Sequence, residues 1–126
     1  MRSRRGFTLI ELLVVLAAMA LLLAMAAPRY IQHVDQGREV VLRHNLAALR
    51  EAIDKFNADR GRLPASLQEL VTERYIRSIP IDPVTDRTDT WVLVGPAGQG
   101  QAGDRVNDVR SGAPGKAADG SAYATW

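Results

Sequence analysis

Hydrophobic residues fill the first part of the chain, and Leu12 to Ala27 contains no charged side chain. As an α-helix, the segment from Phe7 to Ala27 would extend roughly 31 Å, because each residue advances the helix by about 1.5 Å. That length matches the hydrocarbon thickness of a bilayer. Arg2, Arg4 and Arg5 precede the segment with no acidic residue among them. Because flanking positive charge stays on the cytoplasmic side, we expect one membrane-spanning helix followed by an exported remainder.

The helical pattern continues beyond Pro28 as a single apolar stripe. The stripe consists of Val34, Val41, Leu42, Leu46, Leu49, Ile53 and Phe56. Its later members are three or four residues apart, which places them on one helix face. The opposite face carries Arg38, Arg43, Arg50, Glu51, Asp54 and Lys55, which we interpret as solvated, as we do His33 and His44. One long helix from about Thr8 to about Asn57 is therefore predicted, amphipathic in its second half. Its first half has to be buried in membrane or among other copies of the chain.

The long helix is predicted to end at Gly61, a residue type that readily adopts the left-handed conformation found after many helices. Pro64 prevents the helix from resuming. Ser66 and Glu69 then have the spacing of a capping box. They predict a short helix from Leu67 to about Thr72 or Arg74.

Two short strands are predicted in the second half of the chain. Thr90 to Val94 is rich in β-branched and aromatic residues. In a strand from Arg105 to Val109, alternation would place Val106 and Asp108 on the opposite face from Asn107 and Val109. A glycine-rich turn from Gly95 to Gly103 would join them into a β-hairpin. Ser111 to Gly120 is predicted to be an irregular loop, and Tyr123 to Trp126 offers a third short strand whose aromatic rings close the core. The predicted fold class is α+β: a long N-terminal helix on a small antiparallel β-sheet, with a loop-rich C-terminus.

Glu11 is the one charged residue between Phe7 and Pro28. A carboxylate at the bilayer centre is unfavourable by about 2.5–3.5 kcal/mol, and by less near the membrane surface, so a partner is expected. If the chain were cut after Gly6, the new amino group of Phe7 would lie one helical turn away, on the same face. We therefore interpret that amine, from the same chain or a neighbour, as the partner. Pro28 cannot donate to the Ala24 carbonyl, which predicts a kink or local opening, or equally a break where the helix leaves the membrane.

These residues together resemble a known family. Gly6 followed by Phe-Thr-Leu-Ile-Glu at residues 7–11, an apolar stretch and Pro28 is similar to the class III signal of type IV pilins and type II secretion pseudopilins. The resemblance implies cleavage by prepilin peptidase between Gly6 and Phe7, and N-methylation of Phe7. It also implies that Glu11 pairs with the Phe7 amine of a neighbouring subunit during filament assembly.

Later landmarks resemble the major pseudopilins of type II secretion systems in order and spacing. They are Gly61-Arg62-Leu63-Pro64, Tyr75-Ile76 and Ile79-Pro80-Ile81-Asp82-Pro83. Leu63 stands where that family has an aromatic residue, and residues 84–86 replace its usual tryptophan-glycine turn. The resemblance implies a type IV pilin-like fold with a leader peptide of residues 1–6, a transmembrane and filament-core helix of residues 7–28, and a periplasmic head of residues 29–126.

The function implied by the resemblance is that of a structural subunit of a type II secretion pseudopilus, a periplasmic filament that drives export of folded proteins. The alternative in the same class is a type IV pilin or minor pilin. The implied partners are further copies in a helical filament, minor pseudopilins, prepilin peptidase and the inner-membrane assembly platform. The implied location is the inner membrane, crossed once, with the C-terminal head in the periplasm.

The resemblance also implies a calcium site, because major pseudopilins hold Ca²⁺ in the loop before their final strand. Candidate oxygen donors in a comparable place are Asp108, Ser111 and Asp119. Calcium takes six to eight oxygen ligands, so backbone carbonyls and water would have to complete the set. The alternative is that these aspartates cap the loop through Asx turns.

Composition excludes several other classes of function. The chain has 16 basic and 14 acidic residues, and loss of the three leader arginines would leave 13 basic residues, a balance that does not favour nucleic acid. There is no cysteine, so neither a disulfide framework nor thiol chemistry is available. The sequence has no G-x-S-x-G, H-E-x-x-H or phosphate-binding loop, so no enzyme activity is expected.

Three alternatives stay open from the residues alone. The first is an ordinary secretory signal peptide, for which Ala24-Met25-Ala26 would be the cleavage site. The second is an ordinary single-span anchor. Both leave Glu11 unexplained. The third is a membrane-anchored binding module that never polymerises.

Overall fold

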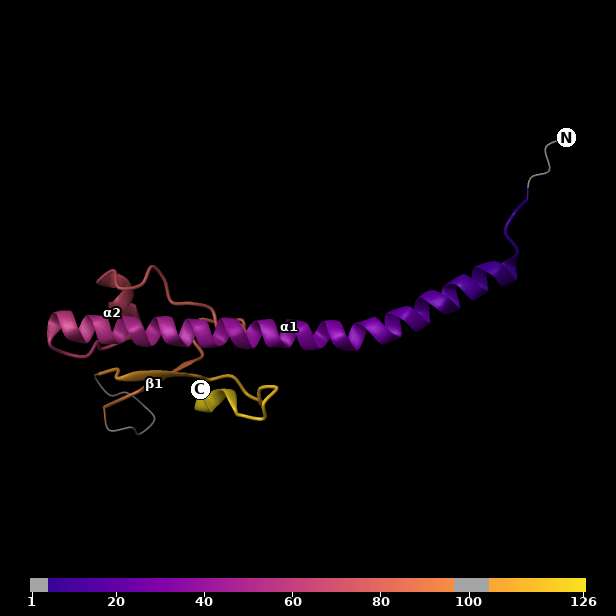
Figure 1. Ribbon diagram of the computed structural model, residues 1–126. Coiled ribbons are helices and arrows are strands. Elements are labelled where there is room, and N and C mark those ends of the chain that lie inside the picture. The colour runs from indigo at the N-terminus through magenta and orange to yellow at the C-terminus, as the bar shows by residue number, and fades with distance from the viewer. Residues whose placement is uncertain (1–4, 97–104) are drawn as a thin grey trace. The chain divides into compact units, whose positions relative to one another are not determined.

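A computed structural model describes residues 5–96 and 105–126 of the chain (Figure 1). The elements follow in the order α1 (Leu9–Arg60), α2 (Leu67–Thr72), β1 (Trp91–Val94), β2 (Asp108–Ser111) and the 3₁₀ helix η1 (Tyr123–Thr125). The chain divides into two compact units, one ending at Asp35 and one running from Gln36 to Trp126. Most of the predicted glycine-rich turn, and residues 1–4 of the predicted leader, lie outside the described residues.

Helix α1 confirms the predicted long helix, which begins one residue and ends three residues later than expected. The helix continues through Pro28, so the chain does not leave the helical conformation there. Proline removes one N–H donor, but the turns on either side keep the helix intact. The predicted break at the membrane exit is therefore not formed.

The end of α1 and the start of α2 follow the predicted capping chemistry. Gly61 has φ +68°, and its N–H donates to the carbonyl of Asn57 at 2.9 Å. Ser66 is the N-cap of α2, and its hydroxyl accepts the N–H of Glu69 at 3.2 Å. The Glu69 carboxylate accepts the N–H of Ala65 at 2.6 Å, one residue before the N-cap N–H that is the usual donor in a capping box.

Strands β1 and β2 form the predicted antiparallel hairpin. Trp91 pairs with Ser111 and Val94 pairs with Asp108, so the sheet has two strands among the described residues. The second strand begins at Asp108, three residues later than predicted. Ser111, predicted to open the irregular loop, is instead the last residue of this strand.

Val106 explains the later start of β2. Its N–H donates to the carbonyl of Pro64 at 2.8 Å, which directs the chain toward the α1–α2 connection before the ladder begins. As a result Val106 and Val109 are both fully buried. The predicted alternation, with these two valines on opposite faces, is wrong for that reason.

The final residues form a 3₁₀ turn, so the predicted third strand is wrong. The N–H of Thr125 donates to Ala122 at 3.0 Å, and the N–H of Trp126 donates to Tyr123 at 3.1 Å. These local bonds take up the donors that a sheet ladder would need. The rings of Tyr123 and Trp126 meet edge to face at 5.2 Å and pack against the core, as predicted.

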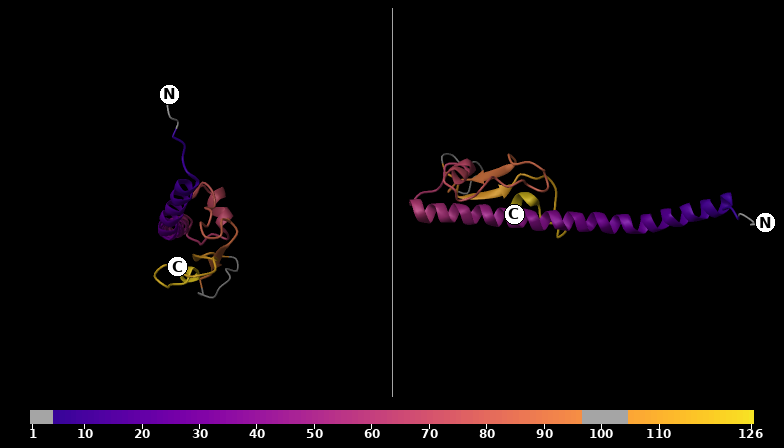
Figure 2. Two further views of the ribbon diagram at one scale, coloured as in Figure 1. Left: turned by 90° about the vertical axis from the view of Figure 1, so that its right-hand side faces the viewer. Right: turned by 90° about the horizontal axis from the view of Figure 1, so that it is seen from above.

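The core of the second unit forms where α2 and the hairpin lie along α1 (Figure 2). It contains Leu42, Leu46, Leu49, Ala52, Ile53, Phe56, Leu67, Leu70, Trp91, Val106 and Val109. The predicted stripe is therefore buried from Leu42 onward, whereas Val34 and Val41 are 38% and 47% exposed. Each fully buried large apolar side chain contributes about 1.5–3 kcal/mol to folding, so this stripe fixes the head on α1.

Candidate functional site

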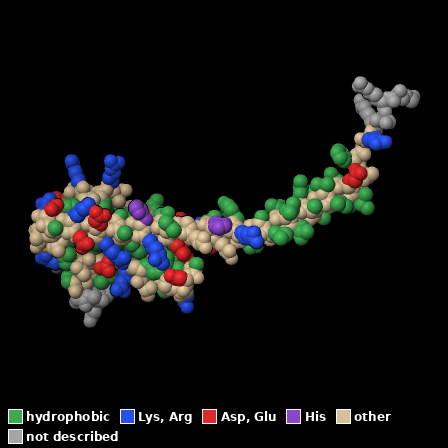
Figure 3. Space-filling view, in the orientation of Figure 1, with side chains coloured by type: hydrophobic (Ala, Val, Ile, Leu, Met, Phe, Trp, Pro, Cys, Tyr) green, Lys and Arg blue, Asp and Glu red, His purple; other side chains and the backbone are tan. Residues whose placement is uncertain are grey.

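The first half of α1 presents apolar side chains that no other residue described by the structure covers. From Leu9 to Met25 every large hydrophobic residue is at least 50% exposed, and Phe7 is 91% exposed (Figure 3). This segment has the length and hydropathy of a membrane-spanning helix. Soluble monomers rarely expose a contiguous apolar surface of this extent. The segment therefore requires lipid or other copies of such a helix around it.

Glu11 has a partner within its own chain at the start of α1. Its carboxylate accepts the N–H of Thr8 at 3.2 Å, and its own N–H donates to the Thr8 hydroxyl at 3.2 Å. This is a capping box, in which two donors at the helix end are satisfied reciprocally. The sequence signal for this cap is Thr-x-x-Glu at residues 8–11, which is separate from the position of Glu11 in an apolar segment.

The candidate cleavage position precedes the helix. Gly6 and Phe7 lie in the non-helical segment before Leu9, and both are exposed. Phe7 and Glu11 line the same open groove, together with Leu12 and Val15. The structure thus brings the residue that would carry the new amine next to the carboxylate predicted to bind it.

The three candidate calcium ligands have separate protein partners. The Asp108 carboxylate is 2.8 Å from Nε of Arg50 and accepts the N–H of Val109 at 2.7 Å. The Ser111 hydroxyl is fully buried and donates to Asp82 at 2.6 Å. One carboxylate oxygen of Asp108 and the Ser111 hydroxyl are therefore each engaged within the head.

Asp119 forms the Asx turn that the sequence offers as the alternative. It accepts the N–H and the hydroxyl of Ser121 at 2.9 and 2.5 Å, and it lies 3.5 Å from a guanidinium nitrogen of Arg43. The Ser121 hydroxyl, and then its N–H, hold the pKa of the Asp119 carboxyl below its ordinary value. Across residues 5–96 and 105–126, no three His, Cys, Asp or Glu side chains are grouped to hold a metal ion. As arranged, the candidate donors do not fit a calcium site.

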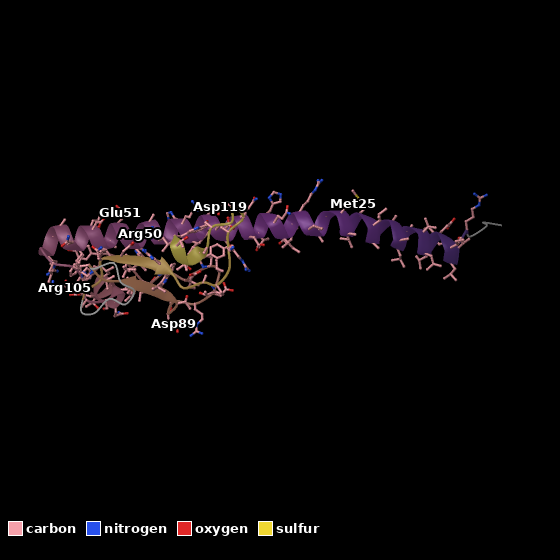
Figure 4. All side chains as sticks on the ribbon, turned by 90° about the horizontal axis from the view of Figure 1, so that it is seen from below. Met25, Arg50, Glu51, Asp89, Arg105 and Asp119 are labelled. Atoms are coloured by element: carbon pink, nitrogen blue, oxygen red, sulfur yellow. The ribbon has the colours of Figure 1, made fainter. Side chains whose placement is uncertain are left out.

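Arg50, predicted to be solvated, is partly buried, whereas Arg43 stays exposed as predicted, and both contact the C-terminal part of the chain. Arg50 bonds Asp108 on β2, and Arg43 lies over the Trp126 ring at 4.1 Å and beside Asp119. Figure 4 labels Arg50 on α1 and Asp119 in the C-terminal segment. No sequence pattern on α1 distinguishes these arginines from the exposed Arg38, because their partners lie far along the chain.

Asp82 is a further residue whose role sequence analysis missed. It is fully buried and accepts hydrogen bonds from the N–H of Val84 at 2.8 Å and from the Ser111 hydroxyl. Burial of a carboxylate is tolerated when its oxygens are hydrogen-bonded. Asp82 thereby joins the loop after α2 to the end of β2.

The sequence is similar to a known family and to several known proteins. The family described as "Prokaryotic N-terminal methylation motif" matches residues 1–27. The chain is 30% identical to type II secretion system core protein G of Klebsiella michiganensis, over 90% of this chain and 89% of that protein. It is 27% identical to the protein of the same name from Xanthomonas campestris, over 96% of this chain and 86% of that protein.

A pilin is also similar, over a shorter region. The type IV major alpha-pilin of Moraxella bovis is 32% identical over 59% of this chain and 46% of the pilin. No solved structure gives a significant match.

Proposed function

The chain belongs to the family of type II secretion system core protein G, the major pseudopilins of the type IV pilin-like class, and from this premise we propose how it assembles and where it works. It is a pseudopilin subunit. We place it in the inner membrane, crossed once by the first half of α1, with the head in the periplasm. From there the subunits would enter a periplasmic filament that drives export of folded proteins.

The observation that carries the proposal is the uncovered apolar surface from Leu9 to Met25 on the helix that also carries the folded head. In a membrane, lipid covers this surface. On leaving the membrane, the segment is stable only if equivalent helices replace lipid, because exposure of so much apolar area to water is strongly unfavourable. The proposed filament is therefore a helical bundle of these apolar segments, with the folded heads on its outside.

Processing would prepare the helix for that exchange. Prepilin peptidase would cut between Gly6 and Phe7, and the Phe7 amine would be methylated. The Glu11 carboxylate, which accepts the Thr8 N–H in the single chain, would then pair with the Phe7 amine of a neighbouring subunit. Both donors lie at the positive end of the helix dipole, where a carboxylate is favoured. Pro28, at the end of the apolar segment, would face neighbouring helices in the bundle.

Further partners follow from the filament hypothesis. Minor pseudopilins would start or cap the filament, and an inner-membrane assembly platform would supply subunits. The role is structural, and the described residues provide no arrangement on which we would base a catalytic proposal.

Deletion of the gene from its host, with complementation by variants, tests the proposal. We expect folded exoproteins to accumulate in the periplasm of the deletion strain and secretion to return with the wild-type gene. A photo-crosslinking residue at Val15 should give a ladder of oligomers, because Val15 lies on the apolar helix surface. The same probe in a Glu11→Leu background serves as the assembly-defective control.

Two results would contradict the proposal. Loss of surface pili with normal protein secretion would indicate the type IV pilin alternative. Crosslinking at Val15 to lipid alone, with no oligomer at any expression level, would indicate a membrane-anchored module that does not polymerise.

A further inference from the structure

Three charged residues of α1 hold the C-terminal segment of residues 113–126 to the helix. They are Glu39, Arg43 and Arg50, which are spaced four and seven residues apart and therefore lie along one side of the helix. This side borders the buried stripe rather than facing away from it.

Arg50 makes the most connections. Its Nε donates to the Asp108 carboxylate at 2.8 Å, and one terminal nitrogen donates to the carbonyls of Val109 at 3.0 Å and Trp126 at 2.7 Å. The Arg50 and Asp108 side chains are 39% and 35% exposed, so the pair is partly withdrawn from water. One planar guanidinium thus joins α1, β2 and the last residue of the sequence.

Arg43 and Glu39 hold the rest of the segment. The Arg43 guanidinium lies 4.1 Å from the centre of the Trp126 ring and pairs with Asp119 at 3.5 Å. The Glu39 carboxylate accepts the N–H of Ala118 at 2.8 Å and the Tyr123 hydroxyl at 3.3 Å. Four residues of the segment, Ala118, Asp119, Tyr123 and Trp126, are therefore tied to side chains of α1.

We propose that Arg50 takes the place of a bound cation at Asp108, so that residues 113–126 are fastened to α1 without calcium. A guanidinium carries a fixed positive charge and donates hydrogen bonds in several directions at once. A calcium ion offers the same two properties to carboxylate and carbonyl oxygens. Both cannot occupy one carboxylate oxygen, because like charges at contact distance repel.

The proposal is independent of the filament hypothesis, because it concerns contacts inside one head. It also accounts for the separation of the candidate calcium donors. Asp108 is used by Arg50, Asp119 by Arg43 and Ser121, and Ser111 by Asp82.

Hydrogen–deuterium exchange of the full chain in detergent micelles tests the proposal. Exchange is followed in peptides covering residues 113–126, with residues 42–56 of α1 as an internal reference for the folded core. Wild-type protein is measured with millimolar calcium chloride and with chelator. We expect the two curves to coincide, because Arg50 already holds Asp108.

The variant Arg50→Gln removes the positive charge and the planar guanidinium group, and it keeps a polar side chain. We expect exchange in residues 113–126 to become about tenfold faster or more, with the reference peptide unchanged, because a partly buried carboxylate loses its charged partner. Arg38→Gln is the matched control, since Arg38 is exposed on the same helix and makes no hydrogen bond or ion pair with a residue that the structure describes.

Each outcome decides the proposal. The proposal would be overturned if calcium slowed exchange in residues 113–126 of the wild-type protein. It would also be overturned if exchange there were unchanged in Arg50→Gln. If calcium slowed exchange in Arg50→Gln but not in wild type, the proposal would be supported, because the Asp108 carboxylate would then be free to bind the ion. If Arg50→Gln does not fold, as judged by the reference peptide, the wild-type calcium comparison alone still supports or overturns the proposal.

Discussion

The N–H of Thr8 donates to the Glu11 carboxylate at 3.2 Å, and the N–H of Glu11 donates to the Thr8 hydroxyl at the same distance. The single chain therefore supplies Glu11 with a neutral donor at the first turn of α1. A cationic donor would attract the carboxylate more strongly, because the Coulomb attraction between two opposite full charges adds to the hydrogen bond. The cap is thus compatible with a later transfer of Glu11 to an amine, and the two roles can be separated by mutation.

Replacement of Glu11 by leucine should abolish polymerisation without preventing membrane insertion or cleavage. The Phe7 amine of a neighbour would then be buried without a partner, which is strongly unfavourable in an apolar environment. Filament yield after shearing or crosslinking is the measurement. Thr8→Ala is the control, because it removes the hydroxyl half of the cap and keeps the carboxylate, so filaments should still form. Wild-type filament yield from Glu11→Leu would remove the pairing argument.

Replacement of Gly6 by valine should leave the uncleaved precursor in the membrane. A Cβ at Gly6 meets no atom within 4 Å, so the chain itself tolerates a side chain there. We therefore expect the block to arise in the peptidase, at a site that accommodates only glycine before the cleaved bond. Intact mass of the membrane-extracted protein reports the outcome, with Glu11→Leu as a variant expected to be cleaved. Normal loss of six residues from Gly6→Val would contradict the class III signal.

Elements set by local chemistry could be predicted from the sequence. The apolar stripe from Leu42 to Phe56 determines which face of α1 is buried, and Gly61 and Ser66 determine where helices end and begin. Each of these signals depends on residues that are no more than about four positions apart in the sequence. The N-terminal segment, with Phe7 and Glu11, is likewise a local pattern.

Features set by distant contacts could not be predicted. The acceptors of Arg50 are 58, 59 and 76 residues away, so nothing near Arg50 distinguishes it from a solvated arginine. The start of β2 depends on the bond between Val106 and Pro64, which belongs to another part of the fold. The partners of the candidate calcium ligands could not be predicted for the same reason: the family resemblance suggested Asp108 and Asp119, whereas α1 supplies Arg50 to Asp108 and Arg43 to Asp119.

Replacement of Gly112 by alanine should destabilise the head. Gly112 follows β2, and a Cβ there would lie 2.1 Å from the carbonyl oxygen of Thr90, which is backbone and cannot rotate away. Forced displacement in a packed region lowers the free energy of unfolding by about 1–3 kcal/mol. Thermal unfolding of the full chain in detergent is the measurement.

Gly37→Ala is the matched control for that experiment. Gly37 lies inside α1, and an added Cβ meets nothing within 4 Å. Alanine should therefore raise helix stability by about 0.5–1 kcal/mol. Equal melting temperatures for Gly112→Ala and wild type would show that the two strands can separate at this end of the hairpin without loss of stability.

Glu69 makes the stability of the α2 region depend on acid. Its carboxylate pairs with Arg62 at 2.5 Å and accepts the N–H of Ala65 at 2.6 Å. The Arg62 hydrogen bond, and then the Ala65 N–H, lower the pKa of Glu69 from its ordinary value of 4.5. A carboxyl whose pKa is lower in the folded chain stabilises the fold above its unfolded pKa, and loses that effect as pH falls through the folded pKa.

Replacement of Glu69 by glutamine should therefore lower stability near neutral pH by about 0.5–1 kcal/mol, a modest value because the side chain is partly solvated. The difference from wild type should stay constant down to about pH 5 and shrink below about pH 4.5, where the unfolded carboxyl begins to take up protons. Urea unfolding across a pH series measures this difference. A double-mutant cycle with Arg62→Gln separates the ion pair from the cap, because only the ion-pair coupling requires both side chains. The contrary result is a stability difference between wild type and Glu69→Gln that is undiminished at about pH 3, where the unfolded carboxyl is protonated. In that case the carboxylate charge is not the cause of the difference.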